Sequence, residues 1–115
     1  MKMATVILLA FLASSHFVTA APLAEGAEAR GTPSCGEWVV HRKKSDTLAL
    51  SNTSWLMGYL SGLAVASGKD FLQGIDNTAI FSWMDNYCLA NPLKDTGAGG
   101  LALMAEKMAK KGSSR

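Results

Sequence analysis

The two cysteines, Cys35 and Cys88, constrain the fold of this chain more than any other feature of its sequence. Two cysteines in an exported chain of this size most simply form a structural disulfide. That bridge would close a loop of about 54 residues, which the chain-entropy model values at roughly 4 kcal/mol. A reactive or redox-active pair is the alternative, but such pairs usually have Cys-x-x-Cys spacing. We therefore predict a structural disulfide between Cys35 and Cys88.

Export is indicated by residues 1–20, which have the features of a cleavable signal peptide. Lys2 supplies a positive start, residues 6–13 form an apolar core, and Val18-Thr-Ala20 offers small residues for cleavage. The apolar run is too short to span a bilayer. We expect cleavage after Ala20; an uncleaved N-terminal anchor is the alternative.

The charge of the cleaved chain, with 10 Lys and Arg against 9 Asp and Glu, excludes several function classes. A net charge of +1 gives no general electrostatic reason to bind nucleic acid or an anionic membrane. His41 and two cysteines are too few ligands for an ordinary zinc site. Asp70, Asp76 and Asp85 are candidate carboxylates, but none forms a recognisable catalytic pair or triad with His41. We expect no catalytic residue, no metal and no cofactor, and therefore a protein that is not an enzyme.

The cleaved chain divides into a lead-in, one domain and a tail. Residues 21–33 are small, polar and interrupted by Gly and Pro, which predicts a disordered lead-in. Residues 34–111 contain the periodic apolar segments and all seven aromatic residues that remain after cleavage. Residues 112–115 are expected to be a frayed tail. The sequence thus predicts a single small domain.

Helical periodicity is clearest in the two segments that contain the cysteines. Ser34 and Glu37 have capping-box spacing, so a first helix is expected to begin there. Asp76 is a predicted N-cap for a third helix. Asn91-Pro92 should end it, because the residue before proline disfavours helical geometry. The apolar face of this third helix is the most regular in the chain and comprises Ile80, Trp83, Met84, Tyr87 and Cys88.

A second helix is expected over about 53–66, or from nearer Leu48, with a broad apolar face. Gly58 and Gly62 lie four residues apart on one side of it. In a secreted domain, this spacing favours close packing against another backbone inside the protein. We therefore predict a tight helix contact at these two glycines.

A last helix is expected to end at Lys110-Lys111, with Leu101, Met104, Ala105 and Met108 along its apolar face. Its first turns are weakened as a helix by Gly97, Gly99 and Gly100, each of which disfavours a helix interior by about 1 kcal/mol relative to Ala. No segment alternates with period two. The predicted fold is all-α: a small bundle of three to four short helices, stapled by one disulfide.

Three motifs together resemble the HdeA/HdeB family of periplasmic acid-stress chaperones. They are Cys35 at the start of the first helix, Trp55-x-x-Gly58-Tyr-Leu-Ser-Gly62 in the second, and Tyr87-Cys88-x-x-Asn91-Pro92 at the end of the third. The resemblance covers roughly residues 34–111. It implies a small periplasmic helical protein whose disulfide joins the early helix to a Cys-x-x-Asn-Pro-like element.

The resemblance also implies a function, in which acid loosens a folded and often homodimeric protein and exposes apolar surface for denaturing client proteins. The charge count agrees with such a response: with all carboxylates protonated, the cleaved chain would carry about +12, and self-repulsion destabilises packing. The disulfide would keep the chain from unfolding fully. The expected client-binding residues are Trp38, Trp55, Tyr59, Phe81, Trp83 and Tyr87.

A second family offers an alternative. Gly58-Tyr-Leu-Ser-Gly62 and Tyr87-x-x-x-Asn91-Pro92, followed by an Ala-rich helix, also look like the Tai-type immunity proteins. Those are periplasmic helical inhibitors of a cell-wall amidase delivered by type VI secretion. Their cysteines usually lie at other places, which favours the chaperone family. The alternative function is therefore binding and inhibition of such an amidase.

Overall fold

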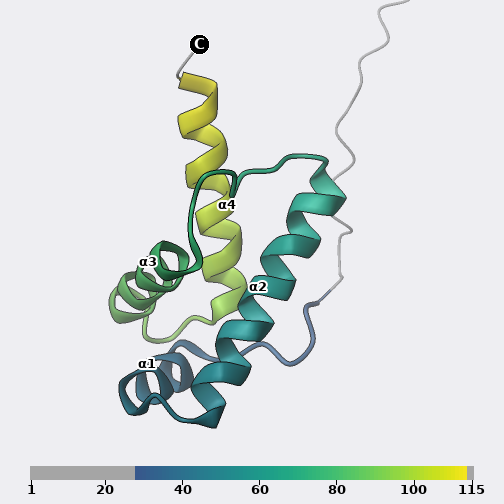
Figure 1. Ribbon diagram of the computed structural model, residues 1–115. Coiled ribbons are helices and arrows are strands. Elements are labelled where there is room, and N and C mark those ends of the chain that lie inside the picture. Colours follow the sequence, from purple (N-terminus) through teal and green to yellow (C-terminus); the bar gives the residue numbers. More distant parts are fainter. Residues whose placement is uncertain (1–27, 114–115) are drawn as a thin grey trace, which may run out of the picture.

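The computed structural model describes residues 28–113, so the predicted signal peptide and its cleavage site lie outside the described residues. The described chain folds into four α-helices and contains no strand (Figure 1). The predicted all-α bundle with a Cys35–Cys88 disulfide is confirmed. The helices are α1 (Cys35–Lys44), α2 (Thr47–Ser67), α3 (Asn77–Ala90) and α4 (Thr96–Ser113).

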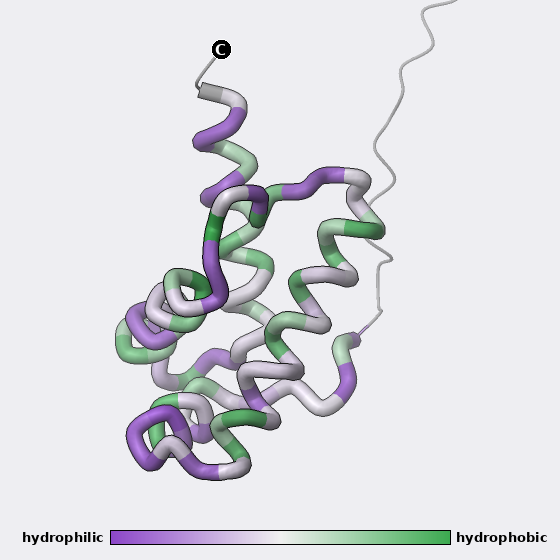
Figure 2. The backbone as a smooth tube through the Cα atoms, viewed as in Figure 1, coloured by the Kyte–Doolittle hydropathy of each residue, from purple (hydrophilic) through white to green (hydrophobic). Residues whose placement is uncertain are grey.

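The four helices pack in the cyclic order α1, α2, α4, α3, so that each rests mainly on two neighbours. The diagonal pairs, α2 with α3 and α1 with α4, make few direct contacts. In Figure 1, α4 runs behind α2 and α3 and extends past the turn that joins them, while α1 lies at the opposite end. Figure 2 shows hydrophilic residues in α1, in the turn after α2 and towards the C-terminal end of α4.

The ends of the helices follow the capping signals of the sequence. Ser34 and Glu37 form the predicted capping box of α1, and Asp76 caps α3 by accepting a hydrogen bond from the Ala79 N–H. The start of α2 lies at Thr47, next to Leu48 rather than near position 53, because Asp46 serves as its N-cap.

The glycines pack where they were not expected to. A Cβ on Gly58 or Gly62 would meet no atom within 4 Å, so the predicted tight contact at these positions is wrong. The close approach occurs instead at the start of α4. There a Cβ on Gly99 would lie 2.5 Å from Met84 Sδ, and one on Gly100 would lie 2.9 Å from Tyr59 Cε1. The glycines that weaken the helix locally therefore allow α4 to pack against α3 and α2.

On α4, Met104 and Met108 pack against the core as predicted, but the prediction is wrong for Leu101 and Ala105. Leu103 is 1% exposed, whereas Leu101 is 43% exposed and Ala105 faces solvent. Leu103 completes a single core to which all four helices and the turn after α2 contribute. The core residues are Cys35, Trp38, Leu56, Leu60, Leu63, Phe71, Ile80, Met84, Cys88 and Leu103.

The segments before α1 and α4 lie side by side. The Cys35 N–H donates to the Lys94 carbonyl, and both the N–H and the hydroxyl of Thr96 donate to the Pro33 carbonyl. Earlier still, the Arg30 carbonyl accepts from the indole Nε1 of Trp55. The end of the predicted lead-in therefore contacts the helical domain before Ser34.

Candidate functional site

The disulfide joins the first turn of α1 to the last turn of α3, with the Cα atoms of Cys35 and Cys88 4.8 Å apart. Both cysteines are almost completely buried, and no free cysteine occurs in the described chain. A second contact joins Arg42, which follows Cys35 on α1, to Asp85, which precedes Cys88 on α3, so the two helices run in opposite directions where they face each other. Residues that follow Cys35 on α1 consequently face residues that precede Cys88 on α3.

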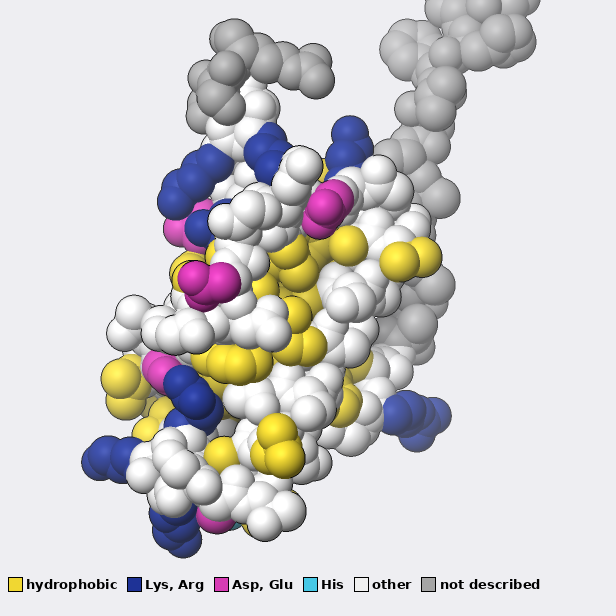
Figure 3. Space-filling view, viewed as in Figure 1, with side chains coloured by type: hydrophobic (Ala, Val, Ile, Leu, Met, Phe, Trp, Pro, Cys, Tyr) yellow, Lys and Arg dark blue, Asp and Glu magenta, His cyan; other side chains and the backbone are white. Residues whose placement is uncertain are grey.

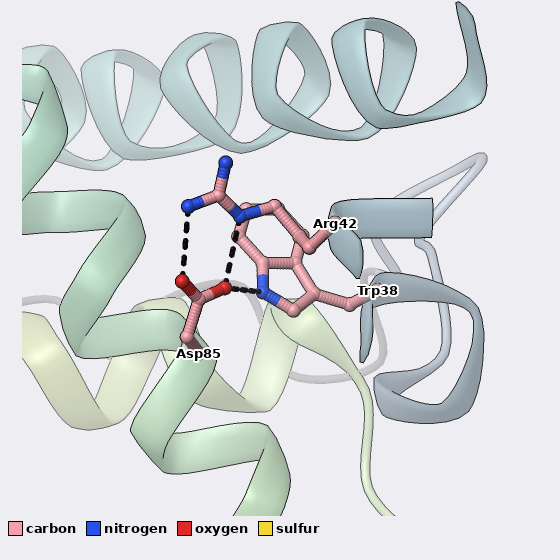
Figure 4. A network of polar contacts seen from close by, with 3 residues as sticks. All are labelled: Trp38, Arg42 and Asp85. Carbon is pink, nitrogen blue, oxygen red and sulfur yellow. Dashed lines mark hydrogen bonds and ion pairs between the residues drawn. The ribbon is translucent and has the colours of Figure 1, made fainter. Parts of the chain in front are cut away.

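Asp85 lies at the second point where α1 is fastened to α3 (Figure 4). Its Oδ1 accepts hydrogen bonds from Trp38 Nε1 at 2.7 Å and from Arg42 Nε at 2.9 Å, and its Oδ2 accepts from Arg42 Nη2 at 2.9 Å. The guanidinium also lies over the rings of Trp38 and Phe81, 5.7 Å and 5.6 Å from their centroids. The Asp85 carboxylate raises the pKa of Arg42 through these hydrogen bonds.

Two further carboxylates connect neighbouring helices. On α4, Glu106 Oε2 accepts from Trp83 Nε1 of α3 at 2.8 Å. Between α1 and α2, Asp46 Oδ2 lies 2.8 Å from His41 Nδ1 while Asp46 Oδ1 accepts from the Ala49 N–H. Together with Asp85, these residues place a carboxylate at three of the four main helix-to-helix contacts.

Carboxylates also accept hydrogen bonds at the N-terminal ends of the helices. Glu37, Asp46 and Asp76 act at the starts of α1, α2 and α3, and Asp95 accepts from the Ala98 N–H at the start of α4. Six of the nine acidic residues of the chain therefore hold a helix start or a helix contact. We call this set the structural carboxylates: Glu37, Asp46, Asp76, Asp85, Asp95 and Glu106.

Two of these carboxylates have a lowered pKa. The pKa of Glu37 is lowered mainly by the hydrogen bond that its carboxylate accepts from the Ser34 N–H, and further by the Ser34 side chain. The hydrogen bond with His41 lowers the pKa of Asp46, and the Ala49 N–H adds to this effect. In both cases the fold stabilises the ionised form, so protonation costs the folded state more than the unfolded state.

The six aromatic residues proposed for client binding form three pairs. Trp55 stacks on Tyr59 with centroids 5.0 Å apart, Trp83 stacks on Tyr87 at 5.4 Å, and Trp38 packs at a tilt on Phe81 at 6.3 Å. Trp38 is fully buried and the other five are partly buried.

Both stacked pairs lie against the start of α4. Tyr59 contacts the position of Gly100, and Tyr87 contacts that of Gly99. Three of the six aromatic residues, Trp55, Tyr59 and Tyr87, therefore lie against one glycine-rich turn, while Trp83 stacks on Tyr87. The third pair, Trp38 and Phe81, lies beside the Arg42–Asp85 ion pair.

The residues considered for catalysis do not assemble into a catalytic centre. His41 pairs with Asp46, whose other oxygen is occupied by the start of α2, and no hydroxyl or thiol of the described chain is hydrogen-bonded to this histidine. Asp85 and Asp76 have the structural partners given above, and Asp70 lies in the turn after α2. In the described residues, no three His, Cys, Asp or Glu side chains come close enough to hold a metal ion.

Sequence reasoning did not assign a structural role to Asp85, Arg42, Asp46 or Glu106. A usable signal existed for Asp85, because it lies one turn before Cys88 while Trp38 lies one turn after Cys35. No comparable signal existed for Glu106, since its contact depends on how the connection between α3 and α4 sets their register.

Comparisons with protein-family models, with curated proteins and with solved structures found no match to this chain. Over residues 28–113, no helix is both long and apolar enough to cross a bilayer.

Proposed function

We propose that this protein is a periplasmic acid-stress chaperone, which loosens at low pH and binds denaturing client proteins through newly exposed apolar surface. The single observation that carries the proposal is the distribution of the structural carboxylates. An Asp or Glu carboxylate is hydrogen-bonded at each helix start and at three helix contacts. Protonation of these carboxylates by acid would remove the negative charge at these positions and weaken the contacts.

The consequence of protonation is sharpest at the contact between α1 and α3. Neutral Asp85 can no longer balance the Arg42 guanidinium, which stays charged at any pH of interest. The side chains of this ion pair are about one third exposed, at 33% and 35%, so water can reach them when the contact opens. Loss of the contact frees Trp38 and Phe81, two of the proposed client-binding residues.

The disulfide determines how far the loosening goes. Cys35 and Cys88 keep the two helices joined at one end while the opposite end opens. The expected product is compact, retains helices and exposes aromatic side chains, which are the properties of an acid state with lost packing. Such a state offers apolar surface without becoming a fully unfolded chain.

Apolar surface already reaches solvent in part of the folded protein. Figure 3 shows hydrophobic side chains in the middle of one face, between α2 and α3, two helices that make few direct contacts with each other. Because α2 and α3 make few contacts with each other, a small further separation of these two helices would enlarge the apolar area between them. This arrangement favours client binding early in the acid response.

The test is protection of unrelated proteins from aggregation at two pH values. Purified oxidised protein is mixed with acid-denatured malate dehydrogenase or alcohol dehydrogenase at about pH 2–3, and light scattering is followed during and after neutralisation. The proposal predicts protection at low pH and none when the same proteins are heat-denatured at pH 7.

The opposite pattern would contradict the proposal. No protection at low pH, combined with tight neutral-pH binding and inhibition of one cell-wall amidase, would establish the immunity-type function instead. A preformed inhibitory surface would act on one enzyme and need no loss of structure.

A further inference from the structure

Two adjoining hollows lie between α1 and α3, and Val39 and Leu89 line both of them. The first, of about 260 Å³, is bounded by the disulfide and Pro92. The second, of about 390 Å³, is bounded by the ion pair described above and by Lys43. We call the two hollows together the α1–α3 groove.

Exposed apolar side chains line and flank the α1–α3 groove. Val40 is 47% exposed, Leu89 is 66% exposed, and Leu93, directly after Pro92, is 99% exposed. Isolated exposed leucines are common on protein surfaces, but three large apolar residues beside one concave surface are typical of an interaction site.

Three charged residues line the groove, and two of them, Arg42 and Asp85, pair with each other. The third is Lys43, which carries a positive charge. Asp85 already accepts hydrogen bonds on both oxygens from α1. The ammonium groups of Lys43 and Lys44 form no ion pair or hydrogen bond with another described residue. Figure 3 shows hydrophobic and Lys/Arg side chains next to each other where α1 meets α3. The groove is thus apolar beside the disulfide and cationic at the end of α1.

We propose that the α1–α3 groove binds a polypeptide segment of a partner protein that combines apolar side chains with one or more carboxylates. An apolar side chain of that segment would fill the hollow beside the disulfide. A carboxylate would lie near Lys43, where it gains a charge-assisted contact. This binding requires the folded, neutral-pH form and is independent of the acid response.

The same features disfavour two other occupants. A two-fold dimer through the groove would bring the cationic ends of two α1 helices, with Lys43 and Lys44, to one interface. Six of the nine carboxylates that could balance them are already engaged within the chain. A membrane surface could contact the protruding Leu93 but would leave the two hollows between α1 and α3 unfilled.

The probe is a library of random dodecapeptides displayed on phage, selected on the immobilised oxidised protein at pH 7. Enriched sequences are synthesised with a fluorescent label, and their dissociation constants are measured by anisotropy. We expect sequences that combine Leu, Ile or Phe with Asp or Glu. Leu89→Ser and Lys43→Glu should each weaken binding by about tenfold or more. Val65→Ser on α2, which alters an apolar residue that is 84% exposed, should leave binding unchanged.

A charge exchange makes the test specific for the proposed orientation. A peptide with Lys in place of its acidic residue should bind Lys43→Glu more tightly than it binds the wild type. Both groove positions are exposed, and near-UV circular dichroism verifies that the variants are folded.

Several outcomes would overturn the proposal. These are the absence of enriched sequences, enriched peptides that bind Leu89→Ser and Lys43→Glu as well as wild type, or failure of the charge exchange. Sedimentation with phosphatidylglycerol vesicles that Leu89→Ser abolishes would identify a membrane site instead. A dimer seen by analytical ultracentrifugation and dissociated by Leu89→Ser would identify a second copy as the occupant.

Discussion

Arg42 of α1 and Asp85 of α3 form a two-bond ion pair, with both nitrogen-to-oxygen distances at 2.9 Å. The pair lies one turn from the disulfide along α3, so α1 is fixed to α3 at two points. One fastening is covalent and indifferent to pH, whereas the other requires an ionised carboxylate. This difference gives acid a defined place to act on the protein.

Asp85→Asn should weaken this contact while keeping the shape of the side chain. We expect a loss of roughly 1–2 kcal/mol at pH 7, because a charged hydrogen-bond acceptor is lost at a partly exposed site. Urea unfolding measures the loss. Asp70→Asn is the matched control, since the Asp70 carboxylate accepts no hydrogen bond from a described residue, and it should change stability by much less. Equal stabilities for the two variants would contradict a structural role for Asp85.

The surroundings of Gly99 and Gly58 predict opposite effects on stability when each glycine is replaced by alanine. Gly99→Ala should destabilise the protein by about 1–3 kcal/mol through overpacking, since its Cβ would lie 2.5 Å from Met84 Sδ and 2.9 Å from Tyr87 Cδ1. Gly58→Ala should stabilise it by about 0.4–1 kcal/mol, because the site is open and alanine favours helix. Thermal unfolding of both variants checks the signs. A stabilising Gly99→Ala would mean that α4 does not pack as described.

Local signals predicted much of this fold. The capping box of Ser34 and Glu37, the Asp76 cap and the Asn91-Pro92 stop each depend on residues close in sequence, and the structure contains all three. The disulfide followed from the number of cysteines and the expectation of export. Such features need no knowledge of which helix packs on which.

Features that depend on helix register were not predictable in the same way. Glycines are compatible with open solvent or with close packing, and only the path of α4 decides that Gly99 is packed while Gly58 is open. The same register places Leu103 in the core and Leu101 at the surface. The contact between Trp83 and Glu106 likewise arises only after α3 and α4 are docked.

The lowered pKa values of Glu37 and Asp46 predict a specific pH dependence. A carboxylate whose pKa is lower in the folded state contributes stability that is complete above its unfolded value, about 4. That stability is lost as pH falls through the lowered, folded value. Glu37→Gln combined with Asp46→Asn keeps neutral capping groups but removes this linkage.

The double variant should therefore be less stable than wild type at pH 7, with a difference that disappears below both folded pKa values. Urea unfolding midpoints measured in steps between pH 7 and pH 2 test this. Parallel stability curves for variant and wild type across that range would contradict the assigned pKa shifts.

Loss of the disulfide should convert loosening into unfolding. Cys88→Ser, or reduction of the native protein, should cost roughly 4 kcal/mol, the chain-entropy value for a cross-link between residues 53 apart. A small domain has little stability beyond that. Far-UV circular dichroism should show large helix loss at about 37 °C in the variant but not in the oxidised wild type. Unchanged thermal unfolding on reduction would contradict this estimate.

An acid titration of the oxidised wild-type protein, followed by near-UV and far-UV circular dichroism, tests the central claim most directly. If ionised carboxylates hold the helix contacts, the near-UV signal of the packed tryptophans will be lost between about pH 4 and pH 2. Over the same range most of the far-UV helical signal will remain, and a hydrophobic dye will bind. A near-UV spectrum at pH 2 that is identical to the one at pH 7, with no dye binding, would contradict the account.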